Sequence, residues 1–203
     1  KAEQEGEAAL KGFLAKHGNV QVGLNLRGDR WTGADFWEKQ ARPGLTLDAL
    51  LERSEVVTVG IDGGGLDDIL GLAVLGRDAT TGEWLLWTHG WLHPIGLERR
   101  KSEAPRYRDF EKDKDLSIVQ DLPEDVTGVA KTVARVNATG LLAGVGLDPE
   151  KTHKVVMQAL IDEGIEESMC IGVSQGWRMV GAITLAERKL ADGQLVHGGQ
   201  PLM

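Results

Sequence analysis

The stretch around Asp62 has the residue types that a divalent-cation site requires. The β-branched run 56–61 predicts a buried strand that delivers the Asp62 carboxylate at its end. Three glycines follow, where the backbone can turn sharply and leave room for a phosphate or a metal ion, and then come Asp67 and Asp68. Mg²⁺ takes oxygen ligands, and one or two carboxylates usually hold it while water and substrate phosphate complete its shell. The stretch is therefore a candidate metal site.

An ordinary hairpin turn explains the same stretch equally well. Asp-Gly between two strands is a strong hairpin signal by itself, and in that interpretation Asp62 belongs to the turn while Asp67 and Asp68 are solvated. The order of the predicted strands and helices decides between the two interpretations, because it determines which other polar side chains reach the same end of the sheet.

The predicted elements form one mixed sheet with helices. Three successive strands, 56–61, 70–76 and 84–91, are separated by short turns and predict an antiparallel meander. Helices and strands then alternate, and the apolar spacing predicts them over helix 97–110, strand 116–119, helix 125–137, strand 141–147, helix 152–162, strand 168–173 and helix 178–191, with 197–203 as a loop. We therefore expect an α/β fold whose later strands add in parallel, with helices on both faces.

Three polar residues end predicted strands of this sheet. Asp62 follows 56–61, Asp148 follows 141–147, and Gln175 comes just after 168–173. Ligands of open α/β sheets bind at the carboxyl ends of the strands. We therefore expect Asp62 and Asp148 to meet at one edge of the sheet.

Composition and charge exclude several classes of protein. The 203 residues suffice for one domain, and a net charge of −8 argues against a protein that coats nucleic acid non-specifically. The chain has neither the G-x-x-x-x-G-K-[ST] phosphate loop nor a C-x-x-C pair. No apolar run reaches the roughly 18 residues of a membrane span, so we expect a cytoplasmic chain without membrane contact.

One segment is densely basic, and it contains Arg99, Arg100, Lys101, Arg106 and Arg108. A solvated helix face explains this cluster at least as well as a surface that contacts phosphates.

Six segments resemble, in their order and spacing, the nuclease domain of tailed-phage terminase large subunits, DNA-packaging proteins that also occur in prophages. These segments are 59–68, 84–88, 144–149, 173–177, 187–193 and 197–202. The resemblance implies a ribonuclease-H-like fold and an endonuclease that uses two Mg or Mn ions to cut concatemeric double-stranded DNA. It also implies an ATPase domain, a small terminase subunit and a portal protein as partners, in the cytoplasm of the host cell.

The resemblance also assigns roles to residues. Asp62 matches the acid that bridges two ions, Asp148 matches an acid that binds one of them, and Asp67 and Asp68 match a supporting acidic pair. The basic cluster and Gln175 are expected to contact DNA. Residues 1–53 correspond to the helical connector from the ATPase motor. Residues 54–203 correspond to the nuclease domain, truncated before the helix that carries the family's third core acid, so that this fragment is expected to have an incomplete site.

Two alternatives share the same residues. Sugar kinases and actin-like ATPases also open with a strand, an acid and a glycine-rich hairpin that holds nucleotide phosphates, although they need two such domains. The second alternative is a catalytically incomplete terminase fragment that serves only in docking.

Overall fold

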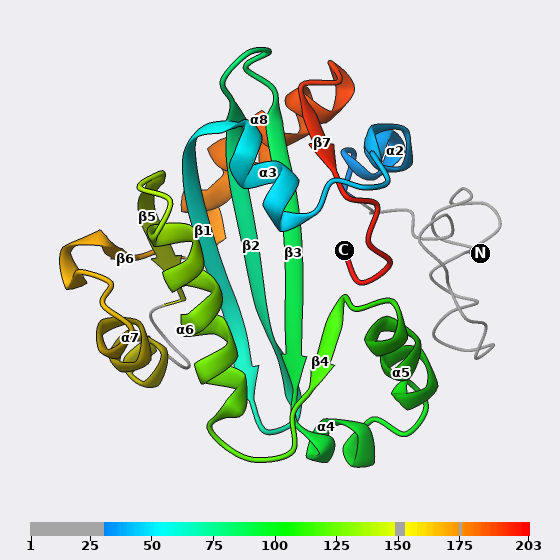
Figure 1. Cartoon of the computed structure of the whole chain (residues 1–203). Coiled ribbons are helices and arrows are strands. Elements are labelled where there is room, and N and C mark those ends of the chain that lie inside the picture. The colour runs from blue at the N-terminus through cyan, green and yellow to red at the C-terminus, as the bar shows by residue number, and fades with distance from the viewer. Residues whose placement is uncertain (1–30, 149–152, 175) are drawn as a thin grey trace, which may run out of the picture.

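The computed structural model describes residues 31–148, 153–174 and 176–203 as a mixed sheet with helices against it (Figure 1). The sheet has seven strands in the order β4-β3-β2-β1-β5-β6, and β7 also pairs with β3. The strands are β1 Ser54–Gly65, β2 Asp68–Asp78, β3 Trp84–Leu92, β4 Leu116–Ile118, β5 Leu142–Leu147, β6 Cys170–Gly172 and β7 Leu195–His197. β1, β2 and β3 form the predicted antiparallel meander, and all the other strand pairs are parallel. The predicted α/β class is confirmed.

The helices among the described residues are mostly short. The α-helices are α2 Ala34–Trp37, α3 Leu47–Arg53, α4 Pro94–Arg99, α5 Ala104–Lys112, α6 Glu124–Asn137, α7 His153–Asp162 and α8 Val180–Ala191, and the 3₁₀ turns are η2 Glu38–Gln40, η3 Glu167–Met169 and η4 Gly176–Met179. α3 and α6 cross one face of the sheet and α8 lies behind the other, so helices occupy both faces (Figure 1). No described helix is long and apolar enough to cross a membrane.

Alternating burial from Val57 to Asp62 of β1 separates the two faces of the sheet. Val57, Val59 and Ile61 are buried in one apolar core together with residues of α3 and α6. Thr58, Gly60 and Asp62 alternate with them and therefore point to the opposite face, because successive side chains of a strand leave opposite sides. The core thus lies on the side of α3 and α6, while small and polar residues of β1 line the other side.

Three local predictions were wrong. The helix expected over 97–110 is two helices, α4 and α5, because Pro105 lacks an N–H and is tolerated only in the first turn of a helix. The buried strand expected over 168–173 is the three-residue strand β6, whose Ile171 is 59% exposed. The segment expected as a terminal loop contains His197, the last residue of the buried strand β7.

Candidate metal-binding site

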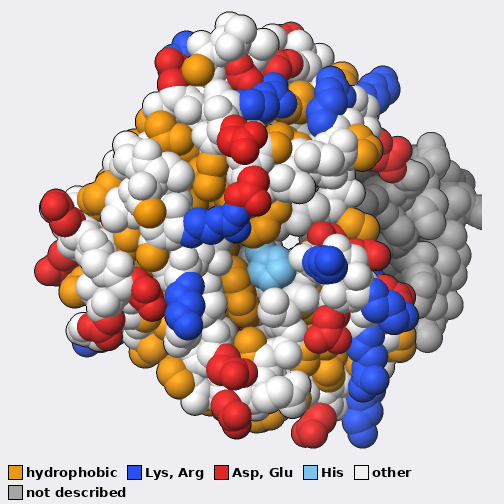
Figure 2. Space-filling model, viewed as in Figure 1, with side chains coloured by type: hydrophobic (Ala, Val, Ile, Leu, Met, Phe, Trp, Pro, Cys, Tyr) orange, Lys and Arg blue, Asp and Glu red, His pale blue; other side chains and the backbone are white. Residues whose placement is uncertain are grey.

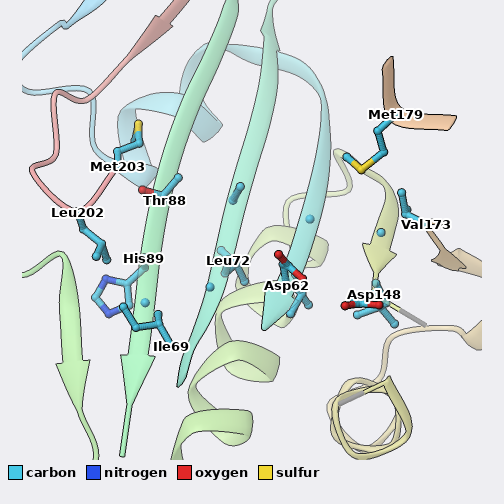
Figure 3. Close-up of a pocket in the computed structure, with 17 residues that line it drawn as sticks. Asp62, Ile69, Leu72, Thr88, His89, Asp148, Val173, Met179, Leu202 and Met203 are labelled. Atoms are coloured by element: carbon cyan, nitrogen blue, oxygen red, sulfur yellow. The ribbon is translucent and has the colours of Figure 1, made fainter. Parts of the chain in front are cut away.

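Asp62 and Asp148 line one pocket of about 560 Å³ (Figure 3). β1 and β5 are parallel neighbours, with Ile61 opposite Leu147, and the Asp148 N–H donates to Ile61 O at 3.4 Å. Asp62 and Asp148 are therefore the next residues along two strands whose spacing is about 4.8 Å. Ile61 and Leu147 are buried in the core, so both carboxylates leave the sheet on its other face. The structure brings together the two acids that were predicted to meet.

Glycines form much of the pocket floor. Gly60, Gly71, Gly90 and Gly146 lie on four neighbouring strands of this face. A Cβ atom added at Gly60 would meet no atom within 4 Å, and one at Gly71 would meet only Asp62 O at 3.7 Å. The floor beside Asp62 is therefore open, and a ligand can approach the sheet backbone closely.

Apolar side chains form the two walls. Val173 and Met179 lie on the Asp148 side, and Leu202 and Met203 lie on the opposite side, beyond β3 (Figure 3). Neither Lys nor Arg is among the residues that line the pocket. The charged side chains of the pocket lining are therefore the two carboxylates, Asp62 and Asp148.

The donor set of the pocket fits a hard divalent cation. Two neighbouring carboxylates repel each other, and a cation between them relieves that repulsion. Among the described residues, no group of three or more His, Cys, Asp or Glu side chains is arranged to hold a metal ion. Two carboxylates are nevertheless what Mg²⁺ commonly takes from a protein when water and substrate phosphate supply the remaining ligands. The pocket therefore fits a metal site that substrate phosphate and water complete better than a metal site made of protein ligands alone.

Asp67 and Asp68 do not line this pocket. Both lie at the β1–β2 turn, where Arg99 Nη1 is 3.0 Å from Asp67 Oδ2 and Arg100 Nη2 is 3.5 Å from Asp68 Oδ1. The hydrogen bond from Arg99 lowers the pKa of Asp67 below its ordinary value. Two predicted metal ligands thus form exposed ion pairs with two predicted DNA contacts, and the structure does not group them with Asp62 and Asp148.

The other basic residues of the predicted DNA surface also lie outside the pocket lining. Lys101 and Arg108 are exposed, and the Arg106 guanidinium lies 5.2 Å from the Phe110 ring centre. Figure 2 shows Lys and Arg side chains at one edge of the molecule, over α5, and mixed charges elsewhere on that face. Gln175 lies outside the described residues. A role of these side chains in DNA binding stays a prediction.

Several residues that line the pocket were not predicted from the sequence. The Thr88 hydroxyl is buried without a hydrogen-bond partner among the described residues, so it is available to a ligand or a water molecule. His89 is also a lining residue, and its Nε2 lies 2.9 Å from Ser117 Oγ. Burial lowers the pKa of His89 below its ordinary value. Aromatic residues alternate with small or polar residues over 87–91, and this pattern indicates a strand. It does not indicate which other strands pair with it.

The mixed sheet and its strand order agree with the ribonuclease-H-like fold that was expected. A search of solved structures finds the large terminase of bacteriophage HK97, with a TM-score of 0.64 and 19% sequence identity. The match covers all of this chain and 42% of the terminase chain, so this chain spans less than half of that protein. The described chain therefore shares its fold with part of that large terminase.

A second solved structure is the terminase nuclease domain of human cytomegalovirus, soaked with Mn and bound to an inhibitor. It matches with a TM-score of 0.42 and 10% identity, over 82% of this chain and 73% of that one, which does not establish a common fold. No protein-family model and no curated protein sequence matches this chain.

Proposed function

We propose that this chain is the nuclease part of a tailed-phage or prophage terminase and acts as a metal-dependent endonuclease on double-stranded DNA. The observation that carries the proposal is the placement of Asp62 and Asp148 side by side in one pocket, on a fold shared with a large terminase. An ATPase domain, a small terminase subunit and a portal protein are the proposed partners, as the sequence resemblance implies.

The two carboxylates have distinct proposed roles. Asp62 would bridge two Mg²⁺ or Mn²⁺ ions, and Asp148 would hold one of them. When bound, such a pair of ions supplies an activated water molecule and stabilises the leaving oxygen of the phosphodiester. The open glycine floor beside Asp62 leaves room for the scissile phosphate. The resemblance places a third acid on a helix that follows the segment equivalent to 197–203.

Substitution of Asp62 by Asn tests the proposal. We expect Asp62→Asn to abolish Mn²⁺-dependent nicking of supercoiled plasmid, in a chain that includes the acid-bearing helix expected from the resemblance. In the absence of metal the same variant should be as stable as the original chain or slightly more stable, because one of two adjacent charges is removed. Chemical denaturation measures this second effect.

Asp67→Asn is the matched control, because Asp67 is an exposed acid outside the pocket. This variant should retain cleavage. Full activity of Asp62→Asn would reject the proposal.

Two binding measurements complete the test. Mn²⁺ titration by calorimetry shows whether the 203-residue chain itself binds the ion. Thermal stabilisation by ATP would instead favour the actin-like or sugar-kinase-like alternative.

A further inference from the structure

The outer edge of β3 is covered by two different strands, with a gap between them. Residues 84–86 pair with β7, and residues 90–92 pair with β4. Thr88 lies in the gap, and its backbone N–H and C=O need partners because buried backbone polar groups are seldom left unpaired. The side chain of Gln200 supplies both: Thr88 N–H donates to Gln200 Oε1 at 3.1 Å, and Gln200 Nε2 donates to Thr88 O at 2.7 Å.

The same amide also reaches a buried carboxylate. Gln200 Nε2 donates to Asp115 Oδ1 at 3.2 Å, and the Leu202 N–H donates to Asp115 Oδ2 at 3.4 Å. Asp115 is only 4% exposed, and its backbone C=O accepts from Gly90 N–H at 3.0 Å. Asp115 thus ties residues 200–202 to β3 and to the start of β4. A buried carboxylate that is stripped of such donors carries a large desolvation cost.

The backbone that leads to Gln200 is also held in place by contacts of residues 197–199. Gly199 has φ +72°, which favours glycine, and its N–H donates to His197 Nδ1 at 3.1 Å. His197 stacks on Trp37 with ring centres 4.1 Å apart. Beyond Gln200, Leu202 packs against the small apolar cluster under α5, and both Leu202 and Met203 line the pocket that holds Asp62 and Asp148.

We infer that Gln200 is a positioning residue for this pocket, which holds Leu202 and Met203 in place as one of its walls. The inference rests on the proposed function for the meaning of the pocket, but not for the contact itself. A glutamine amide has one acceptor oxygen and two N–H donors, and the three contacts use all of them. Glutamate would set a second carboxylate against Asp115, and asparagine is one methylene too short.

A paramagnetic probe tests this inference in the pocket itself. The four methionines include Met179 on one wall and Met203 on the other. In the chain labelled with [methyl-¹³C]methionine, Mn²⁺ bound at Asp62 and Asp148 should broaden both methyl signals. In Gln200→Glu, we expect the broadening of Met203 to fall relative to that of Met179, which should stay unchanged. A general loss of stability would not separate the two walls in this way.

Hydrogen exchange gives a second measurement that needs no metal. The Thr88 amide should exchange slowly in the original chain and rapidly in Gln200→Glu. Gln158→Glu is the matched control, because Gln158 is an exposed glutamine on α7 that bonds only Asp162 among the described residues, and it should leave both measurements unchanged. If Gln200→Glu does not fold, Asp115→Asn is used in its place. That substitution removes one of the two Asp115 oxygens that accept from residues 200–202 and keeps the other.

The outcomes separate the two proposals. If Mn²⁺ broadens neither methyl signal in the original chain, the two carboxylates of this chain do not hold the ion by themselves, and Thr88 exchange decides whether Gln200 holds β3. If Gln200→Glu leaves both Thr88 exchange and Met203 broadening unchanged, the inference is overturned, whatever the nuclease activity.

Discussion

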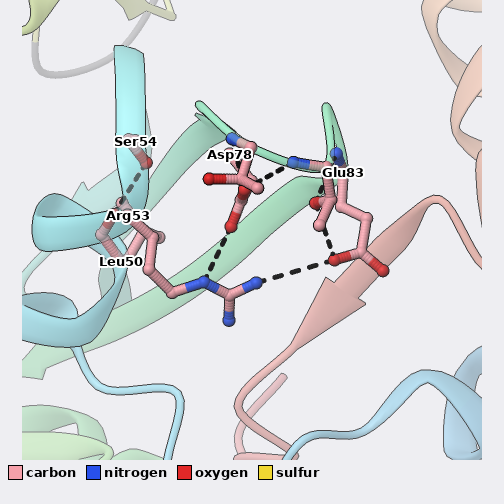
Figure 4. Close-up of polar contacts among 7 residues, drawn as sticks. Leu50, Arg53, Ser54, Asp78 and Glu83 are labelled. Atoms are coloured by element: carbon pink, nitrogen blue, oxygen red, sulfur yellow. Dashed lines mark hydrogen bonds and ion pairs between the residues drawn. The ribbon is translucent and has the colours of Figure 1, made fainter.

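The Asp78 carboxylate closes the turn between β2 and β3. Its Oδ1 accepts from the N–H groups of Thr80 and Thr81, both at 2.8 Å, and its Oδ2 accepts from Arg53 Nε at 2.8 Å (Figure 4). These donors, the two backbone N–H groups first, lower the pKa of Asp78 from 3.8 to about 2. Because the folded-state pKa is the lower one, the contribution of Asp78 to stability is present above its unfolded-state pKa and is lost as the pH falls.

We therefore predict that Asp78→Asn destabilises the chain at neutral pH, because Asn keeps an acceptor for the turn but loses the charge that faces Arg53. The difference in unfolding free energy between this variant and the original chain should shrink between about pH 4 and pH 2. Chemical denaturation at a series of pH values measures it. Asp121→Asn, at an exposed position, is the control. A difference that does not change over this pH range would contradict the assigned role.

The turn that follows α5 contains a residue that is poorly suited to its backbone conformation. Lys114 follows the helix with φ +64°, and Asp115 N–H donates to Phe110 O at 2.9 Å across this end. A left-handed backbone suits glycine, because other L-residues bring Cβ close to the following carbonyl oxygen.

Lys114→Gly should therefore raise the unfolding free energy by roughly 0.5–1 kcal/mol. Lys112→Gly, within the last turn of α5, should instead lower it by about 1 kcal/mol, because it places glycine inside a helix. Thermal and chemical denaturation of the two variants check the opposite signs. A loss of stability in Lys114→Gly would show that another feature determines this helix end.

Elements with a long regular pattern were predictable from sequence, and short ones were not. The alternation in β1 and the helical spacing of Val126, Val129 and Val133 in α6 gave bounds within a few residues of those observed. β7 has three residues, too few for any period to appear, and pairing with β3 rather than local sequence defines it. The same limit hid the pairing of Gln200 with Thr88, which are separated by 112 positions.

Some residues of the candidate site were likewise predictable from the sequence, and others were not. Asp62 and Asp148 were predictable because strand ends and sheet topology place them, and both properties follow from apolar runs. Asp67 and Asp68 have the right chemistry for a metal, but they form ion pairs with Arg99 and Arg100 from a distant part of the chain. Side-chain pairing of this kind depends on how α4 packs beside the β1–β2 turn, which no local pattern specifies.

One apolar core joins α3 to the sheet. Leu50 of α3 is fully buried in the cluster that also holds Val57 and Val133, and a Cβ atom added at Gly76 would lie only 2.9 Å from its Cδ2. We predict that Leu50→Ala lowers the unfolding free energy by roughly 2–5 kcal/mol. Leu66→Ala, at a side chain that is 46% exposed in the β1–β2 turn, should change it by less than about 0.5 kcal/mol. Equal effects in urea denaturation would show that α3 is not part of the core.

The net negative charge of the molecule affects how the proposed nuclease would bind DNA. A chain of net charge −8, with no Lys or Arg among its pocket-lining residues, attracts DNA poorly by itself. Divalent cations at Asp62 and Asp148 would reverse the local charge. At constant ionic strength, Mn²⁺ should therefore tighten the binding of short duplex DNA several-fold, and Asp148→Asn should remove most of that gain, because it removes half of the carboxylate pair. Fluorescence anisotropy measures both effects, with Ca²⁺ in place of Mn²⁺ if cleavage interferes. Binding that ignores divalent ions would mean that DNA contacts another surface, and the basic residues around α5 would become the first to test.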